Sequence, residues 1–97
     1  MRIISRKALR LFWEDHSDAQ QALQAWYADV KRAQWKSPTD IKRTYRNASI
    51  LANNQVVFNI KGNKYRVIVA IQYKFKIVFI RFVGTHQEYD QVDAATV

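Results

Sequence analysis

The spacing of apolar residues changes midway along this chain, from the three- and four-residue repeat of helices to the alternation of strands. Residues 6–16 and 19–33 each carry one apolar stripe at helical spacing, which predicts two amphipathic helices. The stripes consist of Ala8, Leu9, Phe12 and Trp13 in the first segment and of Leu23, Trp26, Tyr27, Val30 and Ala33 or Gln34 in the second. Because the link between them is short, we expect an antiparallel helical hairpin that covers one side of a sheet.

Serine residues stand at the expected helix starts. Ser5 precedes the first helix, and Ser17 with Gln20 has the spacing of a capping box before the second. Residues 37–40, Ser-Pro-Thr-Asp, repeat this signature with proline at the first helical position. They predict a short third helix that ends between residues 43 and 45.

The second half of the chain predicts three antiparallel strands. They span residues 55–60, 64–73 and 76–83 and are rich in Val, Ile, Phe and Tyr. Residues 1–4 predict a further short strand, at an edge of the sheet or beside one of the later strands. Residues 46–54 are expected to be a loop or an extended segment.

The first turn between these strands fixes a register. Gly62 and Asn63 both tolerate positive φ and suit a two-residue hairpin loop. Asn59 then faces Arg66, on the side of the sheet that we expect to point away from the helices.

The second turn brings another guanidinium to the same side. If residues 74–75 form this turn, Arg81 lies opposite Ile68 and shares a face with Arg66. The dipeptide Lys-Phe is unfavourable in a two-residue hairpin loop, so this register holds only if residues 74–75 do form the turn. It predicts one amide and two guanidiniums close together, with the polar residues 85–90 at the end of the strand.

Together these elements predict an α+β fold, with two N-terminal helices packed on one face of a small, mainly antiparallel β-sheet. A length of 97 residues suits a single domain over residues 1–97, and 48% hydrophobic content indicates a folded globule. Trp13 and Trp26 fall in the helical stripes and are assigned to the core, whereas Trp35 is open between core and base stacking. With no apolar run of membrane-spanning length, no secretory signal and no cysteine, we expect a cytoplasmic protein without a membrane partner.

Positive charge is concentrated in the second half. The net charge is +8, and residues 41–87 contain nine lysines and arginines but no aspartate or glutamate. Such a block attracts phosphates, whereas solubilising surfaces usually mix both signs. The expected RNA- or phosphate-binding residues are Lys42, Arg43, Asn59, Lys61 and Lys64.

Metal chemistry is not expected. A hard cation needs converging carboxylates, and the basic half offers only Glu88, Asp90 and Asp93, all at one end. His16 and His86 lie on different elements, and no glycine-rich phosphate loop occurs. We therefore expect neither a metal nor another cofactor.

RNA cleavage without a metal remains open, because RNA supplies its own nucleophile, the 2′-hydroxyl. The protein must then provide a proton acceptor, a proton donor and cations that stabilise the developing phosphoryl charge. Arg66 and Arg81 suit the cationic role, His86 is a candidate base or acid, and Tyr89 is a candidate donor. Lys64 is a candidate cation or, with a depressed pKa, a base.

Each of these residues also has a structural interpretation. Arg66 and Arg81 are alternatively partners of the tail carboxylates at residues 88, 90 and 93, which would tie the tail to the sheet. His86 is alternatively a capping or hydrogen-bonding group, and Tyr89 an ordinary half-buried aromatic residue.

The segments VVFNIKGNKYRVIVAI and IRFVGTHQEYD closely resemble a pattern of HigB-type toxins, which belong to the RelE-like group of bacterial toxin–antitoxin systems. The shared motif runs from Phe58-Asn59 through Gly62-Asn63 and Arg66 to Arg81 and residues 85–90. The resemblance implies an mRNA interferase, an endoribonuclease that inhibits translation by cleaving mRNA on ribosomes. It also implies neutralisation by a small helix-turn-helix antitoxin of the HigA type, with DNA contacted only through that antitoxin. Carried over by motif, the catalytic or phosphate-contacting candidates are Arg66, Arg81, His86 and Tyr89.

We therefore predict the toxin of a type II toxin–antitoxin system, a metal-independent endoribonuclease that acts on mRNA in translating ribosomes. One alternative is a non-catalytic RNA- or ribosome-binding module that uses the same basic sheet face. A second is an interaction protein whose basic block docks an acidic partner. The assignment of general acid and general base among the four candidates stays open.

Overall fold

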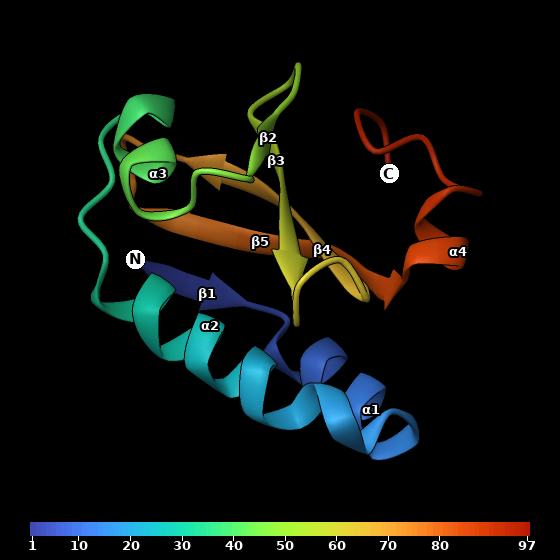
Figure 1. Cartoon of the computed structure of the whole chain (residues 1–97). Helices are drawn as coiled ribbons and strands as arrows, with labels where there is room; N and C mark the ends of the chain where they lie inside the picture. Colours follow the sequence, from blue (N-terminus) through green and yellow to red (C-terminus); the bar gives the residue numbers. More distant parts are fainter.

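In the computed structural model, which describes residues 1–97, five strands form one sheet in the order β1-β5-β4-β3-β2 (Figure 1). All neighbouring strands are antiparallel except β1, which pairs with β5 in parallel. The elements in chain order are β1 (Arg2–Ile4), α1 (Arg6–Asp15), the 3₁₀ turn η1 (Ser17–Ala19), α2 (Gln20–Arg32), α3 (Pro38–Thr44), β2 (Ser49–Ile50), β3 (Gln55–Ile60), β4 (Tyr65–Gln72), β5 (Ile77–Thr85) and α4 (His86–Tyr89). The predicted α+β class is confirmed.

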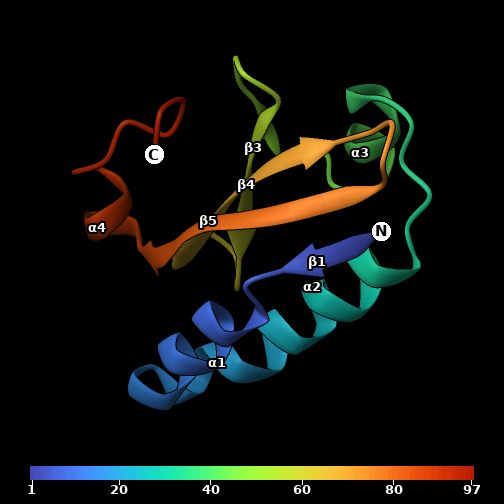
Figure 2. The same cartoon turned by 180° about the vertical axis from the view of Figure 1, so that it is seen from behind.

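Helices α1 and α2 pack together on one face of this sheet (Figures 1 and 2). Their apolar stripes are buried as predicted, and Trp13 and Trp26 belong to the core. Trp35 is only 5% exposed and stacks on Phe58 at 6.0 Å between ring centroids, which assigns it to the core as well. Burial of such side chains stabilises a fold by about 1.5–3 kcal/mol each, so the helical layer is held mainly by this apolar contact.

The predicted helix starts are nearly correct, but the predicted side-chain caps are wrong. Ser5 lies in the left-handed region, at φ 77°, and makes no capping hydrogen bond. The box expected from Ser17 and Gln20 is absent too, since a 3₁₀ turn opens the second helix, and the Ser37 side chain caps nothing. Tertiary burial of an amphipathic face supplies most helical stability in proteins, so these helices form without the caps.

The register between β3 and β4 is confirmed. Asn59 pairs with Arg66, and the intervening loop has Gly62 at φ 66° and a hydrogen bond from the Lys64 N–H to the Lys61 carbonyl. Lys61 also has positive φ, at 53°. The position of this loop is therefore as predicted, but the second left-handed residue is Lys61 rather than Asn63.

The register between β4 and β5 departs from the prediction at one point. Near the turn it is as expected, with Gln72 paired to Ile77, but a β-bulge between Ile68 and Val69 shifts it. Phe82 rather than Arg81 is opposite Ile68. Because β5 is an almost unbroken apolar run, its side-chain alternation does not reveal where the phase changes.

Beyond the bulge, β5 extends to Thr85 and leads directly into α4. The strand thus delivers residues 85–90 at one end of the sheet, while α3 lies at the other end (Figures 1 and 2). None of the helices has the length and apolar character needed to cross a membrane.

Candidate functional site

The residues that follow β5 form a short capped helix, α4, which the sequence did not predict. Thr85 Oγ1 accepts the N–H of Glu88 at 3.1 Å, and the Glu88 carboxylate accepts the N–H of Thr85 at 2.8 Å. This reciprocal capping box starts α4 and uses the Glu88 carboxylate locally. The N–H of His86 donates to the carbonyl of Lys64 at 3.1 Å, so α4 is tied to the loop between β3 and β4.

Arg66 is the most constrained of the predicted cations. The residue is 8% exposed, and its Nη1 donates to the carbonyls of Asn63 at 2.7 Å and Tyr65 at 3.3 Å. Its guanidinium lies over the ring of Tyr89 at 5.5 Å from the centroid. The remaining N–H groups have no protein partner, yet the only buried unpaired side-chain polar atom in the protein is Trp26 Nε1. Those N–H groups of Arg66 are therefore not fully enclosed and remain available to donate to a phosphate.

Gly84, opposite Arg66 in the ladder, makes room for the ring of Phe82 and the carboxylate of Glu88. A Cβ atom at this position would lie 2.5 Å from Cζ of Phe82 and 3.1 Å from Oε1 of Glu88. Gly84 was not among the residues predicted for the site. The signal that could have found it is its place inside a strand, because a glycine there often marks a close approach.

His86 lies on the exposed side of α4. Its side chain is 52% exposed, and Nδ1 lies 3.3 Å from Oδ2 of Asp90. A carboxylate on one ring nitrogen orients the imidazole and leaves the other nitrogen available for proton transfer. Asp90 was expected only as a competitor for the arginines, so its contact with His86 is a finding of the structure.

Arg81 is exposed and does not lie opposite Ile68 as predicted. It occupies the extra position of the bulge, with its guanidinium 5.6 Å from the centroid of the Phe79 ring. It lines a hollow with Gln55, Ala70 and the tail residues 95–97. The predicted pairing of Arg81 with Ile68 is therefore wrong by one position, because the bulge inserts Arg81 between Ile80 and Phe82. The hollow still lies on the face of the sheet that carries Arg66, since Ala70, Ile68 and Arg66 alternate along β4.

The alternative interpretation, in which Arg66 and Arg81 form ion pairs with the tail carboxylates, is not observed. Neither guanidinium forms an ion pair. The three tail carboxylates make other contacts: Glu88 caps α4, Asp90 contacts His86, and Asp93 accepts the N–H of Ala95 at 3.1 Å. The positive charges of both arginines are thus left without a carboxylate partner.

Two of the predicted phosphate-binding residues lie on α3, away from α4. Lys42 Nζ donates to the carbonyls of Arg46 at 2.5 Å and Ala48 at 2.8 Å, so it holds the chain after α3. Arg43 is 75% exposed and pairs with Asp40 at 3.3 Å. The structure therefore separates these two cations from the α4 end of the sheet.

Asn59 does lie beside Arg66, as predicted from the register. Its side-chain N–H donates to the carbonyl of Asn47 at 3.4 Å. It also lines a hollow of about 290 Å³ together with Arg46, Asn47 and Gly62. Asn59 is thus positioned between this hollow and Arg66.

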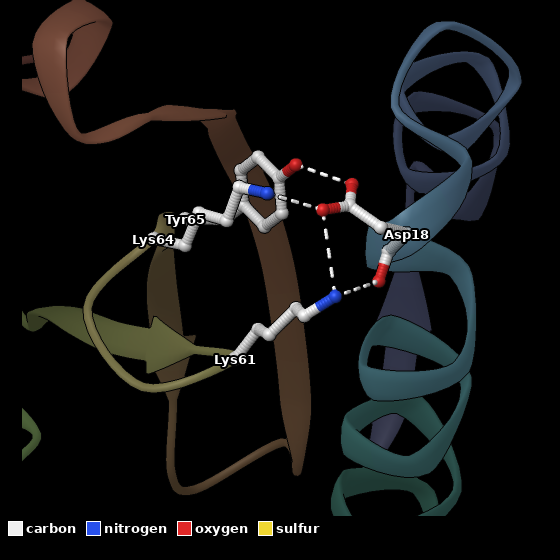
Figure 3. A network of polar contacts seen from close by, with 4 residues as sticks. All are labelled: Asp18, Lys61, Lys64 and Tyr65. Atoms are coloured by element: carbon white, nitrogen blue, oxygen red, sulfur yellow. Dashed lines mark hydrogen bonds and ion pairs between the residues drawn. The ribbon is translucent and has the colours of Figure 1, made fainter.

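Lys61 and Lys64 both pair with Asp18, which η1 contributes from the helical side (Figure 3). The Asp18 carboxylate also accepts the hydroxyl of Tyr65. These contacts hold the pKa of Asp18 well below its ordinary value, and the hydrogen bond from Lys64 has the largest effect. The basic half is free of acids in sequence but not in space, which corrects the expectation of an uncompensated block.

The same contact favours one of the two roles considered for Lys64. Its hydrogen bond to Asp18 raises the pKa of Lys64 above the ordinary lysine value. The ammonium therefore stays protonated, which favours a cationic role and opposes a role as base. No group of three or more His, Asp or Glu side chains converges anywhere in the structure.

Comparison with known proteins places these features in one family. A family model described as HigB toxin, the RelE-like toxic component of a toxin–antitoxin system, matches residues 19–92. The mRNA interferase toxin HigB of Escherichia coli K12 is 28% identical over 92 residues, covering 93% of this chain and 88% of that protein. The mRNA interferase HigB of Escherichia coli O6:H1 is 26% identical over 94 residues, covering 95% and 91%.

Proposed function

Because the chain belongs to the HigB family of RelE-like toxins, we propose that it is an endoribonuclease that cleaves mRNA on translating ribosomes. The observation that carries this proposal is the guanidinium of Arg66. It is held by two carbonyls, lies over the ring of Tyr89 and keeps N–H groups that have no partner in the protein. A guanidinium without a carboxylate partner on β4 and a half-exposed imidazole at the start of α4 are groups suited to a phosphodiester.

The reaction that fits these groups is attack of the RNA 2′-hydroxyl on the adjacent phosphorus. The 2′-oxygen forms a new bond to phosphorus, the bond from phosphorus to the 5′-oxygen breaks, and a 2′,3′-cyclic phosphate results. A base removes the proton of the 2′-hydroxyl, and an acid protonates the departing 5′-oxygen. The net change needs no oxidant, reductant or co-substrate.

Four residues share these roles in the proposal. Arg66 and Arg81 stabilise the charge that develops on the phosphoryl oxygens. His86, oriented by Asp90, exchanges a proton with the substrate, and Tyr89 is the second candidate for proton transfer. Lys61, Lys64 and Asn59 contribute to binding, and the protonated state of Lys64 supports a purely cationic part.

The proposal also includes that cleavage needs no metal ion. It is supported by the donor set near the site, since Glu88 and Asp93 accept backbone N–H groups and Asp90 contacts an imidazole. Hard divalent cations require several free carboxylate oxygens at one point.

The proposed partners follow from the family and the substrate. They are mRNA, the ribosome and a helix-turn-helix antitoxin of the HigA type, with DNA contacted only through the antitoxin. Translating ribosomes are cytoplasmic, which is the compartment we propose for the active toxin. Expression of the chain alone should arrest growth, and co-expression of its antitoxin should relieve the arrest.

The test is cleavage of a defined mRNA in purified ribosomal complexes, with mRNA alone as the comparison. We expect cleavage only in the complexes, with 2′,3′-cyclic phosphate ends or the 3′-phosphate produced from them. Brief addition of EDTA, for as long as the ribosome stays intact, should not slow it. Direct formation of 3′-hydroxyl ends would rule out the 2′-hydroxyl mechanism.

His86→Ala separates this enzyme from a binding module on the same face. The exposed imidazole makes one side-chain contact, so its removal should leave folding and ribosome binding intact while cleavage is lost. Growth arrest that survives His86→Ala at equal protein levels would favour the non-catalytic alternative.

A further inference from the structure

The loop between β3 and β4 supports both sides of the proposed site. The carbonyl of Asn63 accepts from Nη1 of Arg66 at 2.7 Å, and the carbonyl of Lys64 accepts the N–H of His86 at 3.1 Å. The carbonyls of two consecutive loop residues thus position the guanidinium of Arg66 and the first residue of α4. A displacement of this loop moves both groups at once.

The loop itself makes few contacts of its own. It is exposed at residues 61–64, and its internal hydrogen bond, from the Lys64 N–H to the Lys61 carbonyl, is long at 3.3 Å. Surface loops of this kind open easily unless other elements hold them. Its position therefore depends on what is attached to it from outside.

Asp18 provides that attachment (Figure 3). Its carboxylate binds the ammonium groups of Lys61 and Lys64 at the two ends of the loop and the hydroxyl of Tyr65 directly after it. The backbone carbonyl of Asp18 accepts a further bond from Lys61 Nζ at 3.2 Å. The Asp18 carboxylate is ionised at neutral pH, and its depressed pKa keeps it ionised further into the acid range.

Asp18 is in turn fixed by the helical layer. It lies in η1, at the corner between α1 and α2, next to the fully buried Ala19. Tyr65 also packs edge-on against Phe12 of α1, with 5.3 Å between ring centroids. The corner of the helical hairpin and the loop are therefore joined by both polar and apolar contacts.

We propose that Asp18 is a positioning residue for RNA cleavage, which holds the loop of residues 61–64 so that Arg66 and His86 keep their geometry. Asp18 does not touch the substrate; it acts through the two loop carbonyls. This inference rests on the proposed function, and it assigns to the helical half of the chain a part in the chemistry.

The competing interpretation is simple charge masking. If Asp18 only neutralises Lys61 and Lys64, its removal frees two cations for phosphate, and binding of RNA strengthens with no loss of rate. If Asp18 positions the loop, its removal lowers the rate of cleavage. The two interpretations therefore differ in kcat rather than in KM.

Asp18→Asn is the main variant, and Asp29→Asn is its matched control. Asp29 is also a surface aspartate of the helical half, paired with Arg32 at 3.0 Å and accepting the hydroxyl of Tyr45 at 2.8 Å. The two variants change net charge equally and remove similar contacts. Only Asp18 contacts the loop of the site.

We expect Asp18→Asn to lower kcat for mRNA cleavage in ribosomal complexes by roughly ten- to a hundredfold, the scale of small misplacements in active sites. KM should be unchanged or lower, and Asp29→Asn should match the wild type. An unchanged or raised kcat, a loss confined to KM, or an equal effect of both variants would overturn the proposal.

Tyr65→Phe keeps the test valid if Asp18→Asn fails to fold. It removes only the hydroxyl that donates to Asp18 and retains the buried ring. We expect a smaller loss of kcat, and where both single variants fold, a double variant whose loss is less than the product of the two. A wild-type kcat in Tyr65→Phe, or purely multiplicative losses, would count against a shared role.

A second readout does not depend on activity. Hydrogen exchange at the His86 amide reports its bond to the Lys64 carbonyl, and it should be faster in Asp18→Asn than in Asp29→Asn. Equal exchange would refute the link through the loop even if the enzyme is active. Faster exchange in a chain that cleaves no mRNA would instead contradict the proposed function and leave the mechanical link standing.

Discussion

Replacement of Arg81 by alanine separates catalysis from stability in this protein. The side chain is exposed, occupies the bulge of β5 and forms no ion pair. Its one specific contact is with the ring of Phe79, at 5.6 Å from the centroid. Removal of the guanidinium therefore costs the fold only this contact and the packing of the alkyl stem.

The expected loss of stability is small. A cation–π contact at an exposed site contributes about 0.5–1 kcal/mol. In a domain of this size, about 1 kcal/mol corresponds to 4–8 °C in Tm, so Arg81→Ala should lower Tm by roughly 2–8 °C. An arginine paired with a buried carboxylate would cost about 3–5 kcal/mol, which corresponds to well over 10 °C.

The expected loss of activity is large. Removal of one group that stabilises transition-state charge costs about 10²–10³ in kcat. The assay compares the thermal melt of Arg81→Ala with its cleavage rate in ribosomal complexes. Lys74→Ala is the control, because Lys74 also lies over a neighbouring ring, that of Phe75 at 5.8 Å, at the turn between β4 and β5.

Two results would refute this reasoning. A fall in Tm of more than about 10 °C, with activity lost in proportion, would assign Arg81 to the structure. A cleavage rate equal to that of Lys74→Ala would remove Arg81 from the catalytic set.

Arg66, Gly84 and Asp18 give three further predictions. Arg66→Lys keeps the charge but loses the fork fixed by two carbonyls and the stacking on Tyr89, so cleavage should fall and stability should drop by about 1–3 kcal/mol, measured by urea unfolding. Gly84→Ala puts a methyl group against the ring of Phe82 and should cost about 1–3 kcal/mol in the same assay, whereas a neutral effect would mean that the ring moves freely. The pKa of Asp18 is lower in the folded chain than its ordinary 3.8, so its contribution is complete above that value and is lost as the pH falls toward the folded-state value. The difference in Tm between wild type and Asp18→Asn should accordingly be constant near neutrality and shrink below pH 3.8, and a difference that persists to the lowest pH would contradict this assignment.

Local signals in the sequence were sufficient to identify the first three helices, the four longer strands and one of the two key registers, but not η1 or α4. Helical spacing located α1 and α2, and the chemistry of Gly62-Asn63 paired Asn59 with Arg66, as observed. Periodicity and turn preference are set by residues within a few positions of one another, so they can be recognised along the chain alone. The motif of residues 85–90 is equally local, and its residues are contiguous in sequence.

The arrangement of charge depends instead on tertiary packing. The bulge that moves Arg81 away from Ile68 lies in an apolar strand with no turn residue to announce it. Asp18 and Lys64 are 46 residues apart in the chain, so composition along the sequence places them in separate regions of charge. Ion pairing depends on distance in space, which follows from how the helical hairpin packs on the sheet. For that reason the helical half, which is nearly balanced in charge and carries no part of the family motif, supplies the carboxylate that binds the loop beside Arg66 and His86.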